Sequence, residues 1–325
     1  MGRKRKKSKA LDTNKFLLYC LTLIIFLLIF TFYSEANDIH LADVTNELVN
    51  QTVSTKAANV TPIDTGGNTL TIYFFDVGQA DSIFISTGGH NMLIDAGNSA
   101  DGKLLSNYLK NNLGITNLDY LVGTHNHEDH IGGLDDIVKN FDINNLYMPF
   151  VSVTSTKTYE NVENAAIKKD LEIKNPEIDE EFTLGNAVFK VMNVNNHEPK
   201  NKNESSIVLQ MQFGSQKYLF TGDTEVENEN ARSWEDIDVL KVAHHGSKTS
   251  SSEKFLNQAK PEIAIISAGP NNSYGLPTNI VLERLKNIGA TIYRTDELGT
   301  IILTSDGNSN EIKTEKSICL DGNER

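Results

Sequence analysis

The apolar residues of this chain fall into short runs of strand length, and stretches with helical spacing lie between them. The runs predict strands at 69–75, 82–86, 91–95, 118–123, 187–194, 206–213, 217–221, 237–243, 263–267 and 291–294. Helical spacing predicts helices at 103–113, about 132–139, 156–171, 253–258 and 279–287. Hairpins mixed with strand–helix units predict an α/β (α+β) domain over 69–310, in which two sheets pack together and helices lie outside them.

The start of the chain has a different pattern. Residues 1–15 carry seven basic side chains and one acidic one, and the run 16–33 is apolar apart from Thr22 and Thr31. Eighteen apolar residues are just enough to cross a bilayer, and the basic flank predicts a cytoplasmic N-terminus. We therefore expect a single-pass membrane anchor with an extracytoplasmic C-terminal domain. The alternative is a signal peptide cleaved near Ser34-Glu35-Ala36, which would release a secreted protein.

The remaining composition narrows the class. Residues 34–68 are polar without a period and predict a flexible linker, and residues 311–325 predict a polar tail. Cys20 and Cys319 are the only cysteines, so no disulfide framework is expected. The chain carries −13 and its first 15 residues +6, which leaves −19 from Phe16 onward. Such an acidic domain is not expected to bind DNA tightly through a basic face, although a transient phosphodiester substrate stays possible.

Candidate chemistry is concentrated in Thr124-His125-Asn126-His127-Glu128-Asp129-His130, directly after the apolar run 118–123. Imidazole and carboxylate groups at this density are typical of a divalent-metal site. His125 and His127 share a face of extended backbone, and Asp129 with His130 would open the next element and serve a second ion. The alternative is a polar capping loop whose histidines only make hydrogen bonds.

Two later segments support the metal interpretation. The strand-like run 237–243 ends in His244-His245-Gly246-Ser247, and the run 217–221 is followed by Gly222-Asp223. Five of the eight histidines therefore lie in two clusters, while His40, His90 and His197 lie in polar or turn-like stretches and are expected at the surface.

Taken together, His-x-His-x-Asp-His, Thr-Gly-Asp and His-His-Gly-Ser resemble the metallo-β-lactamase superfamily. More narrowly, they resemble the metallo-hydrolase domain of ComEC-type DNA-uptake (competence) proteins, here as a stand-alone domain. Phe75-Asp76-Val77-Gly78-Gln79-Ala80-Asp81, Leu93-Ile94-Asp95-Ala96-Gly97 and Tyr293-Arg294-Thr295-Asp296 extend the resemblance over about 69–304. The resemblance implies a four-layer αββα sandwich.

The resemblance also implies a site with two divalent ions, Zn²⁺ or Mn²⁺. His125 and His127 would bind the first ion. Asp129, His130 and one histidine of the pair His244-His245 would bind the second, and Asp223 would bridge both. The register favours His245, with His244 open as the ligand or as a substrate contact. Asp129, His244, His245 and Lys248 are the candidate catalytic residues, with an ordinary surface lysine as the alternative for Lys248. Backbone amides near Gly246-Ser247, leading toward Ser252, are candidate phosphate contacts.

Two departures from the family pattern change the expected site. The segment 201–206 lacks a histidine that often completes the first metal site, so this site is expected to be weak. Leu276 stands where the related pattern often has histidine, so a proton donor there is missing, and Tyr274 is a replacement candidate or a packing residue.

The resulting prediction is a membrane-anchored, extracytoplasmic, metal-dependent hydrolase, a phosphodiesterase or nuclease. Its expected partners are the membrane and a nucleic acid or other phosphodiester, and no stable protein partner can be inferred. Since metal ligands do not identify a substrate, two alternatives stay open. One is hydrolysis of a lactam, a thioester or a cell-envelope substrate, and the other is a catalytically weak, metal-stabilised binding module.

Overall fold

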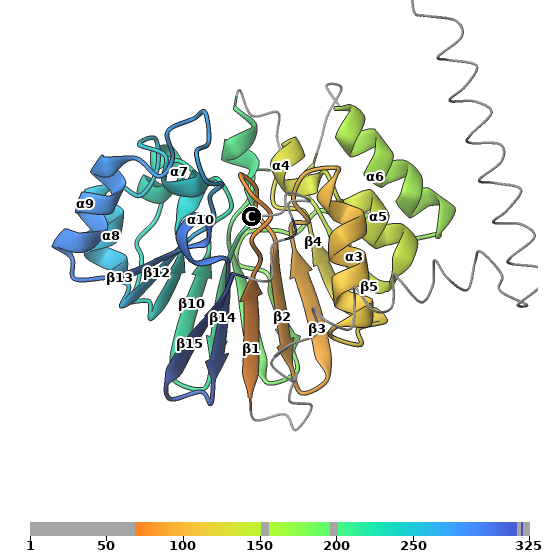
Figure 1. Cartoon of the computed structure of the whole chain (residues 1–325), viewed down its shortest axis with the longest axis horizontal. Coiled ribbons are helices and arrows are strands. Elements are labelled where there is room, and N and C mark those ends of the chain that lie inside the picture. The colour runs from red at the N-terminus through yellow and green to blue at the C-terminus, as the bar shows by residue number, and fades with distance from the viewer. Residues whose placement is uncertain (1–68, 151–155, 196–200, 317–319, 321–325) are drawn as a thin grey trace, which may run out of the picture. The chain divides into compact units, whose positions relative to one another are not determined.

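The computed structural model describes residues 69–150, 156–195, 201–316 and 320, which Figure 1 shows as ribbon. The predicted basic segment 1–15, membrane segment 16–33 and linker 34–68 lie outside these residues, as do both cysteines. Within the described ranges, no helix is long and apolar enough to cross a membrane.

Two sheets form the centre of the domain. The first has eight strands in the order β15-β14-β1-β2-β3-β4-β5-β6, and the second has seven in the order β13-β12-β11-β10-β9-β8-β7. The strands of the first sheet are β1 (Leu70–Phe74), β2 (Ile83–Thr87), β3 (His90–Ile94), β4 (Asn117–Val122), β5 (Asp142–Tyr147), β6 (Ile173–Lys174), β14 (Thr300–Ser305) and β15 (Asn310–Glu315). Those of the second are β7 (Glu181–Leu184), β8 (Ala187–Asn193), β9 (Val208–Phe213), β10 (Gln216–Phe220), β11 (Val239–Lys241), β12 (Ile263–Ile266) and β13 (Thr291–Arg294).

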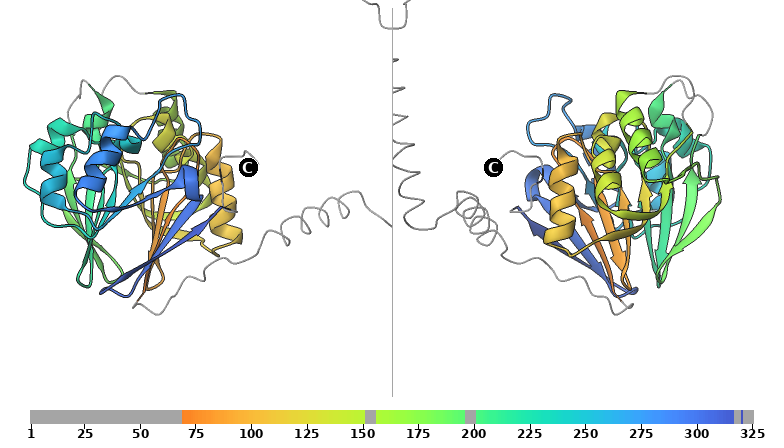
Figure 2. Two further views of the ribbon diagram at one scale, coloured as in Figure 1. Left: turned by 60° about the vertical axis from the view of Figure 1, so that its left-hand side comes forward. Right: turned by 90° about the vertical axis from the view of Figure 1, so that its right-hand side faces the viewer.

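Helices cover the outer face of each sheet (Figures 1 and 2). On the first sheet lie α3 (Asp101–Asn111), α5 (Leu134–Asn140) and α6 (Lys157–Lys168), and on the second lie α8 (Glu253–Ala259) and α9 (Asn279–Asn287). The short helices are α4 (Glu128–Ile131), α7 (Val226–Asn230) and α10 (Thr295–Leu298), with the 3₁₀ turns η1 (Lys202–Ser205) and η2 (Ala243–Gly246). This arrangement confirms the expected four-layer αββα sandwich.

The alternation of apolar residues in β1 explains why the sheets are covered on both faces. Leu70, Ile72 and Phe74 pack in the core between the two sheets, whereas Tyr73 packs in the core beneath the helices of the first sheet. Successive side chains of a strand point to opposite faces, so a strand that is buried at every position needs cover on both. All five residues of β1 are buried.

Several predicted boundaries differ from the structure by one to three residues, and two larger differences change the description of the fold. Residues 311–315, predicted as part of a polar tail, belong to β15, which pairs antiparallel with β14. The folded domain therefore continues beyond 310. β15 is an edge strand in which half of the residues are exposed and none is buried, so its polar sequence resembles a tail. The predicted helix near 132–139 is also preceded by a separate turn of helix, α4, which carries Asp129 and His130.

The direction of the strands determines where the loops converge. β3, β4, β5 and β6 run parallel in the first sheet, as do β10, β11, β12 and β13 in the second. Carboxyl ends of parallel strands lie at one edge of a sheet, where loop residues from neighbouring strands meet. The segments after β3, β4, β10 and β11 contain Asp95, the first histidine cluster, Asp223 and the second histidine cluster, respectively.

Candidate metal centre

The predicted site residues converge from both sheets. His125 and His127 follow β4, Asp129 and His130 lie in α4, Asp223 follows β10, and His244 with His245 forms η2 after β11. Backbone hydrogen bonds join these loops, from Ile207 to Thr124 (2.9 Å) and from His244 to the carbonyl of Gly222 (3.1 Å). The Asp223 amide donates to the hydroxyl of Ser206 (3.2 Å), which fixes the loop after β10.

One set of ligand atoms comes from Asp129, His130, Asp223 and His245, which all lie within 4.8 Å of one another. His130 Nε2 is 3.2 Å from Asp223 Oδ1, and His245 Nε2 is 3.4 Å from Asp129 Oδ2 and 3.8 Å from Asp223 Oδ1. A tetrahedral ion with bonds of about 2.1 Å holds its ligand atoms about 3.4 Å apart. The set therefore has the dimensions of a four-ligand site.

A second set comes from His125, His127 and Asp223. His125 Nε2 is 3.0 Å from His127 Nδ1 and 3.8 Å from Asp223 Oδ2. The two oxygens of Asp223 thus face different sets, which is the arrangement required of a bridging carboxylate. Residues 201–206 add no imidazole or carboxylate to this set, so it has three candidate ligand residues.

Unpaired buried atoms test whether these residues fit a metal. His130 Nε2, His245 Nε2 and Asp223 Oδ1 are buried without a hydrogen-bond partner, and all three belong to the four-residue set. A buried polar atom without a partner is costly, so its presence indicates a ligand that completes the site. These residues therefore fit a divalent cation.

The charges of the residues in the two sets also favour a divalent cation. Burial lowers the pKa of the His125 imidazole well below its usual range, with His130 acting in the same direction, so His125 presents a neutral nitrogen. Burial also opposes the charged form of His130, but Asp223 and Asp95 outweigh it and raise the pKa of His130 well above its ordinary value. Protons on imidazoles thus balance the buried carboxylates, and a divalent cation would replace those protons.

The backbone distinguishes the paired histidines. His244 (φ 50°) and His245 (φ 51°) both adopt the left-handed conformation, which is rare for non-glycine residues and typical of functional sites. This turn directs His245 into the four-residue set, whereas His244 falls outside both sets. Gly246 continues the turn at φ 80°, and a Cβ there would lie 2.5 Å from Pro277 Cβ, so only glycine fits.

His244 instead contacts a polar group of residues beside the site. Its Nδ1 is 3.3 Å from Glu225 Oε1, and its Nε2 is 3.7 Å from Asp223 Oδ2. Glu225 accepts hydrogen bonds from Asn201, Asn203 and Thr249, so its carboxylate is firmly placed. His244 is therefore a residue at the edge of the site rather than a member of the four-ligand set.

Sequence reasoning assigned no role to Asp95, which lies directly behind the ligands. Its Oδ2 accepts from His130 Nδ1 at 2.7 Å and from the Thr124 hydroxyl at 2.8 Å. A carboxylate on the far nitrogen orients a ligating imidazole and determines its tautomer. The segment Leu93-Ile94-Asp95-Ala96-Gly97, part of the family resemblance, contained this signal.

The expected phosphate contacts and the packing role of Tyr274 need correction, whereas the role of Lys248 stays a prediction. The Ser247 amide donates to the carbonyl of His244 (2.8 Å), and the Ser251 and Ser252 amides donate to Glu229, so these groups are not free for phosphate. Tyr274 is 75% exposed, so the suggested packing role is wrong. Lys248 is exposed in the turn after the second cluster, and its catalytic role stays a prediction.

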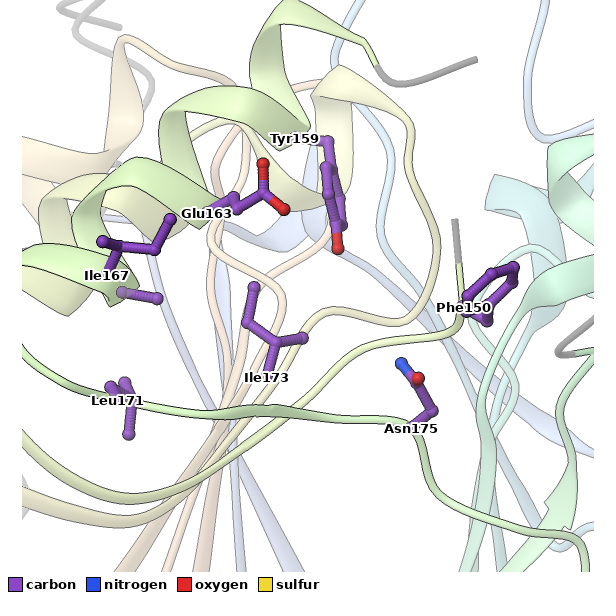
Figure 3. A pocket seen from close by; sticks show the side chains of 8 residues that line it. Phe150, Tyr159, Glu163, Ile167, Leu171, Ile173 and Asn175 are labelled. Carbon is purple, nitrogen blue, oxygen red and sulfur yellow. The ribbon is translucent and has the colours of Figure 1, made fainter. Parts of the chain in front are cut away.

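Other features lie outside the centre. His90 is exposed beside Asp119, as expected, whereas His40 and His197 lie outside the described residues. A cavity of about 370 Å³ lies beside α6 and is lined by Phe150, Tyr159, Ile167 and neighbouring residues (Figure 3). None of the site residues lines it.

Comparisons with known proteins agree with this geometry. Residues 75–269 match the family described as the metallo-beta-lactamase superfamily. Relatives include ComE operon protein 3 of Bacillus subtilis, 35% identical over 248 residues, covering 70% of this chain and 32% of the relative. Recombination protein 2 of Haemophilus influenzae is 32% identical over 234 residues, which cover 70% of this chain and 28% of the relative. Competence protein ComA of Neisseria gonorrhoeae is 28% identical over 239 residues, which cover 72% of this chain and 32% of the relative. The chain thus matches about a third of each relative's length.

Solved structures show the same fold at low sequence identity. The metallo-beta-lactamase fold protein YhfI from Bacillus subtilis aligns with a TM-score of 0.50 and 12% identity, covering 73% of this chain and all of YhfI. A mutant of the CmlA β-hydroxylase aligns with a TM-score of 0.51 and 13% identity, covering 72% of this chain and 53% of CmlA. The chain belongs to the metallo-β-lactamase superfamily and is related to ComEC-type competence proteins, which confirms the predicted class of metal-dependent hydrolase.

Proposed function

We propose that this member of the metallo-β-lactamase superfamily is a two-metal phosphodiesterase, held on the outer side of the membrane by its N-terminal segment. The observation that carries the proposal is the pair of ligand sets that share Asp223. Two ions on one bridging carboxylate suit in-line displacement at phosphorus, because they stabilise both the attacking and the leaving oxygen. The relatives' names refer to competence and recombination, which supports a nucleic acid as the phosphodiester.

Each residue then has a defined task. His125, His127 and Asp223 would hold the first ion, and Asp129, His130, Asp223 and His245 the second. Bound there, the ions would lower the pKa of a water molecule and supply a hydroxide near neutral pH. The Asp129 side chain is 33% exposed, unlike the buried His130, Asp223 and His245, so it faces the solvent side where a substrate enters. Its free oxygen can accept a hydrogen bond from the attacking water and orient it.

The acidity of the chain limits the kind of substrate. A charge of −19 from Phe16 onward disfavours tight binding to long duplex DNA. We therefore expect turnover with weak affinity, on single-stranded DNA or small phosphodiesters rather than on duplex DNA.

A substrate panel tests the reaction class. Full-length protein loaded with Mn²⁺ or Zn²⁺ is expected to hydrolyse bis-p-nitrophenyl phosphate or single-stranded DNA, and a chelator should abolish the activity. Release of nitrophenolate and denaturing gels measure the two reactions. If the loaded protein opens only a lactam or a thioester, the phosphodiesterase assignment is wrong. Metal loading without turnover of any substrate supports the binding module.

The membrane location is a separate proposal that rests on residues 1–33. Protease added to intact, wall-stripped cells should digest the C-terminal domain, because the positive flank retains the N-terminus in the cytoplasm. Immunoblotting against the domain measures its loss, with a cytoplasmic protein as the control for lysis. Protection until the cells are lysed would contradict the proposed orientation, and recovery in the medium would support signal cleavage.

A further inference from the structure

A lysine lies in the interior of the domain beside the candidate metal centre. All three residues of β11 are buried. Val239 packs between the two sheets and Leu240 packs beneath the helices of the second sheet. Since side chains alternate along a strand, Lys241 shares the face of Val239 and enters the space between the sheets. A buried ammonium group is strongly unfavourable unless it is paired, so this lysine requires an explanation.

Its partner comes from the other sheet. Lys241 Nζ lies 2.7 Å from Asp81 Oδ2, and these side chains are 0% and 2% exposed. The ammonium also donates to the carbonyl of Val242 at 3.1 Å. Asp81 lies in the loop between β1 and β2, 160 residues earlier in the chain. The pair therefore links the two sheets at the end where the metal-ligand sets lie.

Asp81 is also in contact with the candidate ligands. Its amide donates to the carbonyl of Asp129 at 3.0 Å. Its Oδ1 is 3.6 Å from His245 Nδ1, and its Oδ2 is 4.0 Å from His130 Nδ1. These are the nitrogens remote from Asp223, since the Nε2 atoms of both rings face that carboxylate. Asp81 thus lies behind two rings of one ligand set.

The direct hydrogen bonds to these rings come from other groups. His130 Nδ1 is 2.7 Å from Asp95 Oδ2, and His245 Nδ1 is 3.0 Å from the carbonyl of Ser267. Asp81 is therefore not needed as a hydrogen-bond acceptor for either ring. Its contribution is a negative charge behind both rings at once, and Lys241 holds that charge in place.

We propose that Asp81 and Lys241 are a positioning pair that determines the cation affinity of the four-residue set. This inference rests on the proposed metal centre. The Asp81 carboxylate favours the imidazole form that keeps its proton on Nδ1 and presents Nε2 to the ion. Lys241 offsets the charge of Asp81 and keeps it in an outer position, so that it does not become a ligand itself. Asp81 therefore raises the affinity of the set for a cation, and Lys241 lowers it.

The test compares Asp81→Asn, Lys241→Met and the double variant in the full-length protein purified in detergent. The probe is Mn²⁺ alone, and competition with a chelator gives its affinity. Asp81→Asn should weaken Mn²⁺ binding about 10- to 100-fold, the range found for outer partners of metal ligands, because the negative charge behind the two imidazole rings is then lost. Lys241→Met should leave the affinity equal or higher.

Folding is measured in parallel. Both single variants should lower the midpoint of thermal unfolding in excess chelator, because each leaves a buried charge unpaired. The double variant removes both charges, so it should unfold at a higher temperature than either single variant and bind Mn²⁺ less tightly than the wild type. Lys157→Met is the matched control, since Lys157 forms an exposed pair with Glu160, and it should change neither quantity.

Equal weakening by both single variants would mean that the pair only supports folding, and would overturn the inference. If the single variants do not fold, the double variant decides: wild-type affinity in that protein would also overturn it. A wild-type protein that binds neither Mn²⁺ nor Zn²⁺ would instead refute the proposed metal centre itself.

Discussion

Replacement of Asp223 by alanine is expected to remove metal from both sites and to abolish hydrolysis. Its two oxygens face different ligand sets, with Oδ1 3.2 Å from His130 Nε2 and Oδ2 3.8 Å from His125 Nε2. Loss of an outer partner typically weakens metal binding about 10- to 100-fold, so loss of a shared ligand should weaken it by at least about 100-fold at each site. Metal analysis after gel filtration measures the effect.

The thermal stability of Asp223→Ala separates metal loss from misfolding. In excess chelator, the variant should still unfold in a single cooperative transition, at a lower midpoint than the wild type because His130 loses its carboxylate partner. Metal at 100 times its dissociation constant should stabilise the wild type by about 2.7 kcal/mol, and this gain should vanish in the variant. His127→Ala should lose only the first ion. Unchanged metal content in Asp223→Ala would refute its assignment as the bridging ligand.

The second large effect is expected at Asp129. Burial raises the pKa of this carboxyl, but the neighbouring His245 imidazole and the charge of His130 outweigh burial and hold the pKa below its ordinary value. Asp129 is therefore a carboxylate, 3.4 Å from His245 Nε2. Asp129→Ala removes a ligand of the second ion and the acceptor for the attacking water, so turnover of bis-p-nitrophenyl phosphate should fall at least about 100-fold.

The variant Asp129→Asn separates the two roles. An amide keeps one oxygen toward the ion but is a weaker ligand and a weaker acceptor. We expect it to retain more metal than Asp129→Ala while losing most of the turnover at saturating metal. Asp236→Asn is the matched control, because Asp236 is exposed beside Lys260, and it should behave like the wild type. Full activity in Asp129→Asn would contradict a role for Asp129 in orienting water.

The sequence predicted the layers better than the edges. Every residue of β1 is buried, as are the last three residues of β10. Both strands are therefore apolar enough to be predicted from the sequence pattern. β5, β6, β7, β14 and β15 were missed. β6, β7 and β15 lie at sheet edges and β5 begins with Asp142 and Asn144 exposed, whereas β14 is a buried, largely apolar run that the same pattern should have identified. Edge strands are often polar, so their pattern does not distinguish them from loops.

The site residues that lie close together in the sequence were predicted from their spacing, whereas features that arise only in the folded chain were not. His125, His127, Asp129 and His130 lie within six positions, so local density was enough to identify them. The choice between His244 and His245 depended on two left-handed residues, which no spacing rule gives. The partnership of Asp81 with Lys241 spans 160 residues and required the packing of two sheets.

A crystal structure of the protein soaked with Mn²⁺, with anomalous diffraction recorded, tests the two-metal centre most directly. We expect two anomalous peaks about 3.5–4 Å apart, one on each side of the Asp223 carboxylate. One peak should contact His125 and His127, and the other Asp129, His130 and His245. The absence of peaks at Asp223 in fully soaked crystals, or a second ion held by His244 in place of His245, would contradict this account.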